Sequence, residues 1–453
     1  MVPVVLCGGE GTRLRPWSTP TRPKPLVHLP SGDETLLAAT LRRLEAPGFA
    51  APRLMAGRHH APALSAAFPG VAMLVEERPA GTAAAVLMAA LQAGEATLLV
   101  VPADHVIHDT EALHEAVRCA LPAAAEGRVV VFGVRPTYAA TGFGWITQGA
   151  SVGPGVAAVD AFLEKPDPPT ARALLLAGGH LWNAGMFLFH GPALVRLAAE
   201  LTPELLRACQ RAVAAATTDG ATVHLAAPLP AGGPSFDVAV MERLPSDRAA
   251  VVALDVGWDD VGTWDAVGRV GSADASGNVL LGRVTQEGCR DSVVVSDGPA
   301  VMVSGLEGVV VAASPEGVVV LPRHDSERVK HLAWPGLERR PWGGFARLDR
   351  GPGYQVKRLV VSPGQRTSLQ RHAHRSERWT VISGCATVHL DGNDLVLHRG
   401  EDVLVPLGAV HRLGNDGAEP LVVLELQTGV YLEEDDIERL SDDYGRVELS
   451  ESE

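Results

Sequence analysis

The first apolar run of the chain, residues 2–7, leads directly into a turn whose residues can bind phosphate. The glycines of that turn and the polar residues after them are Gly8, Gly9, Gly11, Thr12 and Arg13. Glycine permits a tight turn in which backbone N–H groups point at an anion, and Thr and Arg add side-chain donors. Lys24 follows between two prolines, which hold the backbone extended and limit where its ammonium can reach. We therefore expect a phosphate-binding loop in which Arg13 and Lys24 balance the charge.

Lysine is rare in this chain. Of the 39 lysines and arginines, only four are lysines, namely Lys24, Lys165, Lys330 and Lys357. Because arginine serves wherever any cation suffices, a retained lysine indicates a place that needs a compact ammonium. We treat Lys330, which lies in an irregular stretch, as a bystander.

A second group of residues with metal-binding side chains lies near the C-terminus. His372 and His374 alternate, so on a strand they would share one face, and Glu377 and His411 follow. The spacings are G-x7-H-x-H-x2-E-x6-G and G-x5-P-x-G-x2-H-x3-N. Three imidazoles and a carboxylate suit Zn²⁺, Fe²⁺ or Mn²⁺, with room for a substrate. The alternative is a barrel whose histidines bind no metal.

The elements that would position the phosphate loop form an alternating pattern. The expected strands are 2–7, 52–56, 71–75, 97–101 and 129–134, and the expected helices include 33–45 and 82–93. Strands that alternate with helices indicate an α/β fold with a mostly parallel sheet covered on both faces. Asp104 follows one of these strands, where a carboxylate can hold Mg²⁺ at the carboxyl edge of the sheet or can cap a helix.

The pattern changes near residue 270. Short Val-rich runs separated by Gly, Ser, Asp and Pro predict a small all-β, β-helix-like segment. From 354 to 427, alternating runs predict an antiparallel barrel or jelly roll. We therefore expect three parts, and their predicted boundaries are 1–268, 269–335 and 336–453.

Composition excludes several classes of protein. A formal charge of −14, without a Lys/Arg-rich run, argues against a nucleic-acid surface. No apolar stretch is long enough to cross a membrane. The five cysteines are scattered, which suits free thiols in a reducing compartment: Cys7, Cys119, Cys209, Cys289 and Cys385. We expect a cytoplasmic protein.

The motif G-G-x-G-T-R-L-x-P followed by R-P-K-P resembles that of sugar-phosphate nucleotidylyltransferases, which have a Rossmann-like domain. The resemblance implies that the nucleotide is bound by Leu6, Gly8, Gly9, Gly11, Thr12, Arg13, Lys24, Gly81 and Thr82. It implies sugar-phosphate contacts from Gly142, Glu164, Lys165 and Asn183, and a Mg²⁺ site at Asp104 and Asp260. Arg13, Lys24 and Lys165 would then be the catalytic cations. Taken singly, Asp260 can also cap a helix and Asn183 can also be a turn residue.

The blocks WNAGMF and DVGWDDVGTW resemble bacterial mannose-1-phosphate guanylyltransferases that also carry a mannose-6-phosphate isomerase domain. GTP and mannose 1-phosphate are the substrates this branch implies, and we expect a homodimer. The chain departs from the branch at Glu10 and Arg15, and it reads GTAAA where RNTAP is usual. The alternative is therefore a nucleotidylyltransferase for another base or sugar whose C-terminal domain only binds ligands or joins subunits. A regulator that senses sugar nucleotides without catalysis is less compatible with two metal carboxylates.

The C-terminal stretches SLQRHAHRSERW, VHRL and LELQTG resemble the isomerase domain of the same enzymes, which is a cupin. The metal ligands implied are Gln370, His372, Glu377 and His411, with His374 as the alternative to Gln370. Zn²⁺ or another divalent transition metal would polarise the sugar carbonyl while a base moves a proton between C1 and C2 of mannose 6-phosphate or fructose 6-phosphate. Candidates for that base are Lys357, Arg412 and Glu425.

Overall fold

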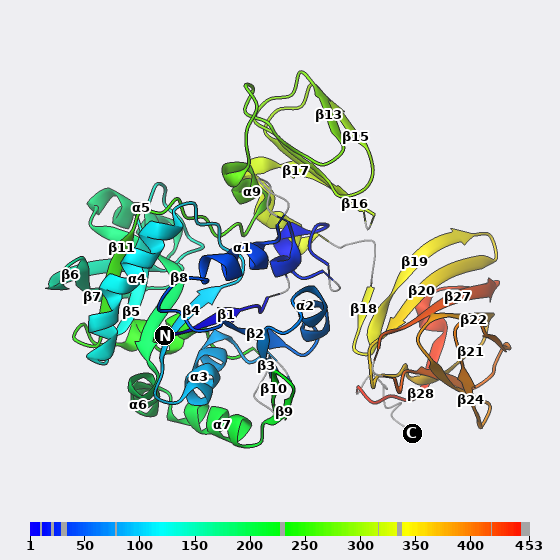
Figure 1. Cartoon of the computed structure of the whole chain (residues 1–453). Coiled ribbons are helices and arrows are strands. Elements are labelled where there is room, and N and C mark those ends of the chain that lie inside the picture. Colours follow the sequence, from blue (N-terminus) through cyan, green and yellow to red (C-terminus); the bar gives the residue numbers. More distant parts are fainter. Residues whose placement is uncertain are drawn as a thin grey trace. The chain divides into compact units, whose positions relative to one another are not determined.

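The computed structural model describes the chain except for residues 10, 20–21, 29–33, 78, 227–231, 316, 333–337, 418 and 445–453. Glu10, one of the departures noted above, therefore lies outside the described residues. The chain divides into two compact units, Met1–Lys330 and His331–Glu453 (Figure 1). The three predicted domain boundaries remain predictions. Among the described residues, no helix is long and apolar enough to cross a membrane.

The first unit is built on a mixed sheet of eleven strands in the order β5-β11-β7-β6-β8-β4-β1-β2-β3-β10-β9. The neighbours β4, β1, β2, β3 and β10 run parallel, with Val5 opposite both Leu54 and Val101. The strands are β1 (Val2–Leu6), β2 (Arg53–Gly57), β3 (Ala72–Glu76), β4 (Thr97–Pro102), β5 (Val129–Val134), β6 (Trp145–Gly153), β7 (Val156–Leu163), β8 (His180–His190), β9 (Thr217–Asp219), β10 (Thr222–Leu225) and β11 (Ala249–Leu254). The α/β prediction is confirmed, and β6, β7 and β8 add antiparallel pairings to the parallel core.

Helices cover the sheet, and alternate strand residues belong to two different apolar cores. Their bounds are α1 (Leu36–Arg43), α2 (Ala61–Ala67), α3 (Thr82–Ala93), α4 (Thr110–Ala125), α5 (Pro168–Ala177), α6 (Gly191–Leu201), α7 (Pro203–Ala214), α8 (Phe236–Ala239) and α9 (Trp264–Val270). Val4 packs in one core and Val5 in the other, as the two-residue period of a strand requires. This alternation fixes the direction of every side chain at the carboxyl edge of the sheet.

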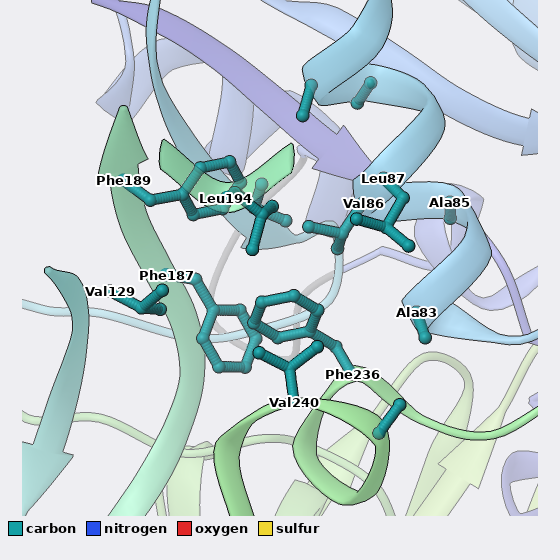
Figure 2. Close-up of a cluster of buried hydrophobic side chains, with 14 of the residues drawn as sticks. Ala83, Ala85, Val86, Leu87, Val129, Phe187, Phe189, Leu194, Phe236 and Val240 are labelled. Atoms are coloured by element: carbon teal, nitrogen blue, oxygen red, sulfur yellow. The ribbon is translucent and has the colours of Figure 1, made fainter. Parts of the chain in front are cut away.

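The first of these cores surrounds α3. Figure 2 shows Val86 and Leu87 of α3 beside Phe187 and Phe189 of β8 and Phe236 of α8. The rings of Phe187 and Phe236 lie 4.7 Å apart in an edge-on arrangement. Helix α3 is rich in alanine and is buried along most of its length, which allows α6 and α7 to pack closely against it. The packing holds the N-terminus of α3 in a fixed place at the sheet edge.

A β-helix-like segment follows α9 within the first unit. Strands β12 (Val279–Leu281), β14 (Val293–Ser296) and β16 (Val309–Ser314) pair in parallel, and so do β13 (Val284–Glu287) and β15 (Val301–Ser304). Strand β17 (Gly317–Pro322) closes the first of these sheets against β16. The prediction of a small all-β segment of this kind is confirmed.

The second unit is an antiparallel sandwich of two sheets, in the orders β18-β19-β20-β27-β22-β25 and β24-β23-β26-β21-β28. Its strands are β18 (Glu338–Arg340), β19 (Gly343–Gly351), β20 (Tyr354–Val361), β21 (Leu369–His372), β22 (Arg375–Ser383), β23 (Ala386–Leu390), β24 (Asn393–Leu397), β25 (Asp402–Val405), β26 (His411–Gly414), β27 (Leu421–Gly429) and β28 (Ile437–Ser441). The jelly-roll prediction is confirmed.

The interior of this sandwich changes character along its strands. Apolar residues such as Leu359, Val381 and Val423 fill one end. At the other end the inward positions carry buried polar residues, among them Gln355, Lys357, Glu377, Glu425 and Gln427. Buried charges are expensive unless they are paired or bind a ligand, so this end is the candidate site of the second unit.

Candidate active sites

Lys24 lies at the centre of the candidate site in the first unit. It begins a short 3-10 turn, Lys24–Leu26, and only 9% of the residue is exposed. Its Nζ donates to Asp104 Oδ2 at 2.5 Å and to the backbone oxygen of Asp260 at 3.0 Å. One ammonium therefore joins the phosphate-loop segment to both acidic segments that the sequence associates with metal.

The two carboxyl groups near Lys24 differ in their electrostatics. Burial alone would raise the pKa of Asp104, but the ammonium of Lys24 holds that pKa below its usual value. Burial raises the pKa of Asp260, and the nearby Asp259 charge adds to the effect while Lys24 opposes it. A further cation between these groups would favour the ionised form of Asp260. Carboxylate oxygens such as those of Asp104 and Asp260 are hard ligands of the kind that Mg²⁺ prefers.

The glycine loop fits closely around Lys24. Gly11 has φ +61°, and a Cβ atom there would lie 2.9 Å from Lys24 Cβ. Any larger residue would displace the lysine, which explains the need for glycine at this position. Leu6 ends β1, Gly8 and Gly9 are exposed, and Thr12 and Arg13 lie in the 3-10 turn Thr12–Leu14. The Arg13 side chain is 43% exposed, and its Nη1 lies 3.8 Å from Glu327 Oε1.

Gly81 and Thr82 lie at the start of α3, where packing fixes the backbone. Gly81 has φ +86°, and a Cβ atom there would lie 2.4 Å from the backbone oxygen of Gly233. Thr82 Oγ1 accepts a hydrogen bond from the backbone N–H of Phe236 at 2.9 Å. The predicted nucleotide-binding residues Gly81 and Thr82 thus lie so close to a second loop that no side chain fits at position 81.

The predicted sugar residues lie beside acidic groups that sequence reasoning missed. Lys165 Nζ donates to Glu164 Oε1 at 2.6 Å, and Asn183 Nδ2 donates to Asp237 Oδ1 at 2.7 Å. Burial raises the pKa of Asp237 to about 6, and the charge of Glu164 adds to the shift. The charges of Glu164 and Lys165 both act on Asp237, the hydrogen-bond partner of Asn183, so the three predicted sugar residues lie in one neighbourhood. Gly142 lies in an exposed turn.

Glu242 is a second acidic residue that the sequence did not single out. Its Oε1 accepts a hydrogen bond from the backbone N–H of Glu164 at 2.8 Å. Asp237 and Glu242 lie in α8 and the turn after it, far along the chain from Glu164. No local spacing links them to the sugar residues, so only the fold reveals the group.

The second unit contains a compact group of metal-binding side chains. His372, Glu377 and His411 are almost fully buried, and one ligand atom from each lies within 4.8 Å of the others. Glu377 Oε1 lies 3.1 Å from His372 Nε2, and Glu377 Oε2 lies 3.8 Å from His411 Nε2. The Gln370 amide nitrogen lies 3.5 Å from each of the two Nε2 atoms. A half-turn of this amide would present its oxygen to the group instead.

Hydrogen bonds on the far side of each imidazole set its orientation. His372 Nδ1 donates to the backbone oxygen of Asp436 at 3.2 Å, and His411 Nδ1 donates to that of Ala409 at 2.9 Å. Because Nδ1 carries the proton in each of these hydrogen bonds, Nε2 of each ring faces the group and can supply the lone pair that a metal requires. Burial lowers the pKa of His411, which favours the neutral ligand form. The two imidazoles, Glu377 and Gln370 together fit a divalent transition metal.

His374 lies outside this group. Its side chain is 55% exposed, and its Nδ1 lies 2.8 Å from Asp436 Oδ1. The expectation that His372 and His374 share one strand face is wrong, because β21 ends at His372 and the alternation stops there. Of the two alternatives that the sequence left open, the structure brings Gln370 to the group.

Two of the three candidate bases line the same cavity as Gln370 and Glu377. Lys357 and Glu425 do so, whereas Arg412 lines a different cavity beside Arg366 and His389. Burial raises the pKa of Glu425 to about 8, and the nearby charge of Glu377 adds to the shift. Lys357 Nζ donates to Glu434 Oε1 at 2.5 Å. Lys357 and Glu425 thus remain candidates for proton transfer.

The fold and the two candidate sites define a two-part protein: an α/β domain with a glycine-rich loop, and a cupin whose interior holds a group of potential metal ligands. Residues 2–277 match the family model described as Nucleotidyl transferase, and residues 329–442 match that described as Mannose-6-phosphate isomerase C-terminal. The chain belongs to the family of mannose-1-phosphate guanylyltransferases that carry a mannose-6-phosphate isomerase C-terminal domain.

Relatives in two bacteria match the chain over its whole length. The mannose-1-phosphate guanylyltransferase of Sinorhizobium fredii is 39% identical, with 100% of this chain and 93% of that protein covered. The protein of the same name in Escherichia coli is 36% identical, with 99% of each covered. A solved structure from Thermus thermophilus, described as mannose-1-phosphate geranyltransferase, is 35% identical with a TM-score of 0.65. That comparison covers 73% of this chain and 97% of the other.

Proposed function

We propose that the first unit transfers a nucleotidyl group from GTP to mannose 1-phosphate, giving GDP-mannose and pyrophosphate. The observation that carries the proposal is the position of Lys24, whose ammonium joins the glycine loop to Asp104 and Asp260. The names of the full-length relatives support this choice of substrates. The reaction brings two anions together, so the protein must neutralise and orient them more than it must form a bond.

Each residue then has a defined task. The backbone of the glycine loop and Arg13 bind the triphosphate, and Lys24 places a positive charge beside it. Lys165 and Asn183 orient the sugar phosphate. Asp104 and Asp260 would hold Mg²⁺, which supplies charge neutralisation for the phosphates.

We propose that the second unit interconverts mannose 6-phosphate and fructose 6-phosphate. Gln370, His372, Glu377 and His411 would hold Zn²⁺ or another divalent transition metal, which would polarise the sugar carbonyl. The burial of both imidazoles and the lowered pKa of His411 support metal binding. Lys357 or Glu425, both in the same cavity, would move the proton between C1 and C2.

A transferase for another base or sugar is the second candidate. The GTAAA stretch favours it, because this stretch stands where RNTAP is usual and the backbone oxygen of Gly233 leaves no room for a side chain at position 81.

Pyrophosphate release from each of four nucleoside triphosphates with several sugar 1-phosphates tests which pair the transferase prefers. Isomerase turnover on the same preparation tests the cupin. In the first assay we expect GTP with mannose 1-phosphate to give the highest kcat/KM. In the second we expect isomerase turnover of mannose 6-phosphate. Another preferred pair, or a cupin without turnover, would favour the second candidate. A homodimer in the cytoplasm remains our prediction.

A further inference from the structure

Four cations line the cavity that Gln370 and Glu377 of the metal-binding group also line, and three of the four have anionic partners. Lys357 pairs with Glu434 at 2.5 Å, and Arg340 lies 3.1 Å from Glu338. Arg375 Nε lies 3.1 Å from Glu377 Oε1, while its Nη1 donates to the backbone oxygen of Glu433 at 2.8 Å. The charges of these three residues are therefore balanced within the protein.

The fourth cation, Arg439, has no such partner. Its Nε is buried without a hydrogen-bond partner, and no carboxylate of the described residues lies within ion-pair distance of its guanidinium. Its side chain is only half-exposed and lines the cavity together with Gln370 and Glu377. A buried donor without a partner costs stability, so such a group is explained when a ligand supplies the acceptor.

The register of the sheet places Arg439 beside the metal-binding group. On β28, Arg439 is directly opposite Gln370 on β21, and Gln370 is in turn opposite His411 on β26. Opposed residues in an antiparallel pair have Cβ atoms about 5 Å apart. The long arginine side chain can therefore bind an anionic group at one end of a substrate whose other end lies at the metal-binding group.

We propose that Arg439 binds the phosphate of the sugar phosphate on which the isomerase site acts. The inference rests on the proposed isomerase function and adds the residue that would distinguish phosphorylated from unphosphorylated sugars. A guanidinium offers paired N–H donors that match the oxygens of a phosphate. A phosphate monoester also brings the negative charge that would balance the positive charge of Arg439. The carbonyl end of the sugar would then lie toward Gln370 and His411, and its phosphate end toward Arg439.

Arg412 provides a matched control. It is also partly buried, its Nε also has no hydrogen-bond partner, and it follows His411 on β26. It lines the other cavity, however, and its Nη2 donates to the backbone oxygen of Ser441 at 3.2 Å. Loss of Arg412 should therefore leave the phosphate site intact.

The test compares Arg439→Gln, Arg439→Lys and Arg412→Gln in the full-length, metal-loaded protein. We expect Arg439→Gln to weaken calorimetric binding of mannose 6-phosphate and raise its KM by about 10- to 100-fold, as for loss of a charged hydrogen bond. Its metal content should stay unchanged. Arg439→Lys should recover part of the loss, and Arg412→Gln should match the wild type.

The outcomes separate this inference from the isomerase proposal. A wild type that binds mannose 6-phosphate through Arg439 but does not turn it over would support the phosphate site and contradict the isomerase. Unchanged binding in Arg439→Gln, an equal loss in Arg412→Gln, or a wild type that does not bind mannose 6-phosphate would overturn the assignment of Arg439.

Discussion

The ammonium of Lys24 lies 2.5 Å from the carboxylate of Asp104 and 3.0 Å from the backbone oxygen of Asp260, a residue 236 positions further along the chain. This contact ties the predicted phosphate-binding segment to both candidate metal ligands. It also explains why a chain that uses arginine almost everywhere has a lysine here. The base of the lysine side chain is also closely packed, since a Cβ atom on Gly11 would lie 2.9 Å from Lys24 Cβ.

Lys24→Arg should reduce kcat/KM for nucleotidyl transfer by at least about tenfold, equivalent to about 1.4 kcal/mol. A guanidinium is larger and planar, so it cannot reproduce both short contacts of the Lys24 ammonium, with Asp104 and with the backbone oxygen of Asp260. Steady-state pyrophosphate release at varied GTP measures the effect. Lys330→Arg is the control, because Lys330 is 40% exposed and pairs only loosely with Glu327. Equal, small effects in both variants would show that the lysine is not required.

Asp104→Asn and Asp260→Asn should each lower the transfer rate by roughly 100-fold or more, the size of other strong electrostatic contributions at active sites. Each change removes a hard anionic ligand from the proposed Mg²⁺ site. The Mg²⁺ concentration that gives half-maximal activity should also rise. Near-normal turnover in both variants, with unchanged Mg²⁺ dependence, would contradict the metal assignment.

Gln370→Ala and His374→Ala should differ sharply in bound metal. Gln370 lies 3.5 Å from both imidazole Nε2 atoms, whereas His374 is 55% exposed and contacts Asp436 instead. Removing one ligand typically weakens a metal site, so we expect Gln370→Ala to lose metal and isomerase activity together. His374→Ala should retain both. Metal analysis after gel filtration checks this, and the opposite order would move the site to His374.

Glu76 should make the stability of the first unit depend on pH. It is 8% exposed at the end of β3, its Oε1 has no hydrogen-bond partner among the described residues, and burial raises its pKa from 4.5 to about 7. Between pH 4.5 and 7 the Glu76 carboxyl group is ionised in the unfolded chain but keeps its proton in the folded protein. The free energy of unfolding therefore falls as the pH rises through this range.

The loss should reach on the order of 3 kcal/mol above pH 7, since each pKa unit corresponds to about 1.4 kcal/mol. Glu76→Gln removes the charge and should unfold at a higher temperature than the wild type at pH 8, with a smaller difference at pH 5. Calorimetric unfolding at the two pH values measures this. A difference between the two proteins that does not change with pH would show that Glu76 is not buried as an ionised group.

Local patterns predicted the fold and singled out the residues at the centre of each candidate site. The glycine loop, the proline-flanked Lys24, and the alternation of apolar residues in the jelly roll all act over short stretches of chain. The turn that ends β21 at His372 was not visible in the His-x-His spacing, because strand ends depend on pairing with other strands. Asp237, Glu242 and Arg439 were missed for a related reason: their partners lie far away in the sequence and come together only across the folded sheets.

The central claim is that one chain carries two independent chemistries, and crossed inactivation tests it most directly. GTP-dependent pyrophosphate release and mannose 6-phosphate isomerisation are measured in the same preparations of the wild type, Lys24→Ala and His411→Ala. Separate cores rarely share the residues that touch a ligand, so Lys24→Ala should abolish only transfer and His411→Ala only isomerisation. Loss of both activities in either folded variant, or absence of one activity from the wild type, would contradict the account.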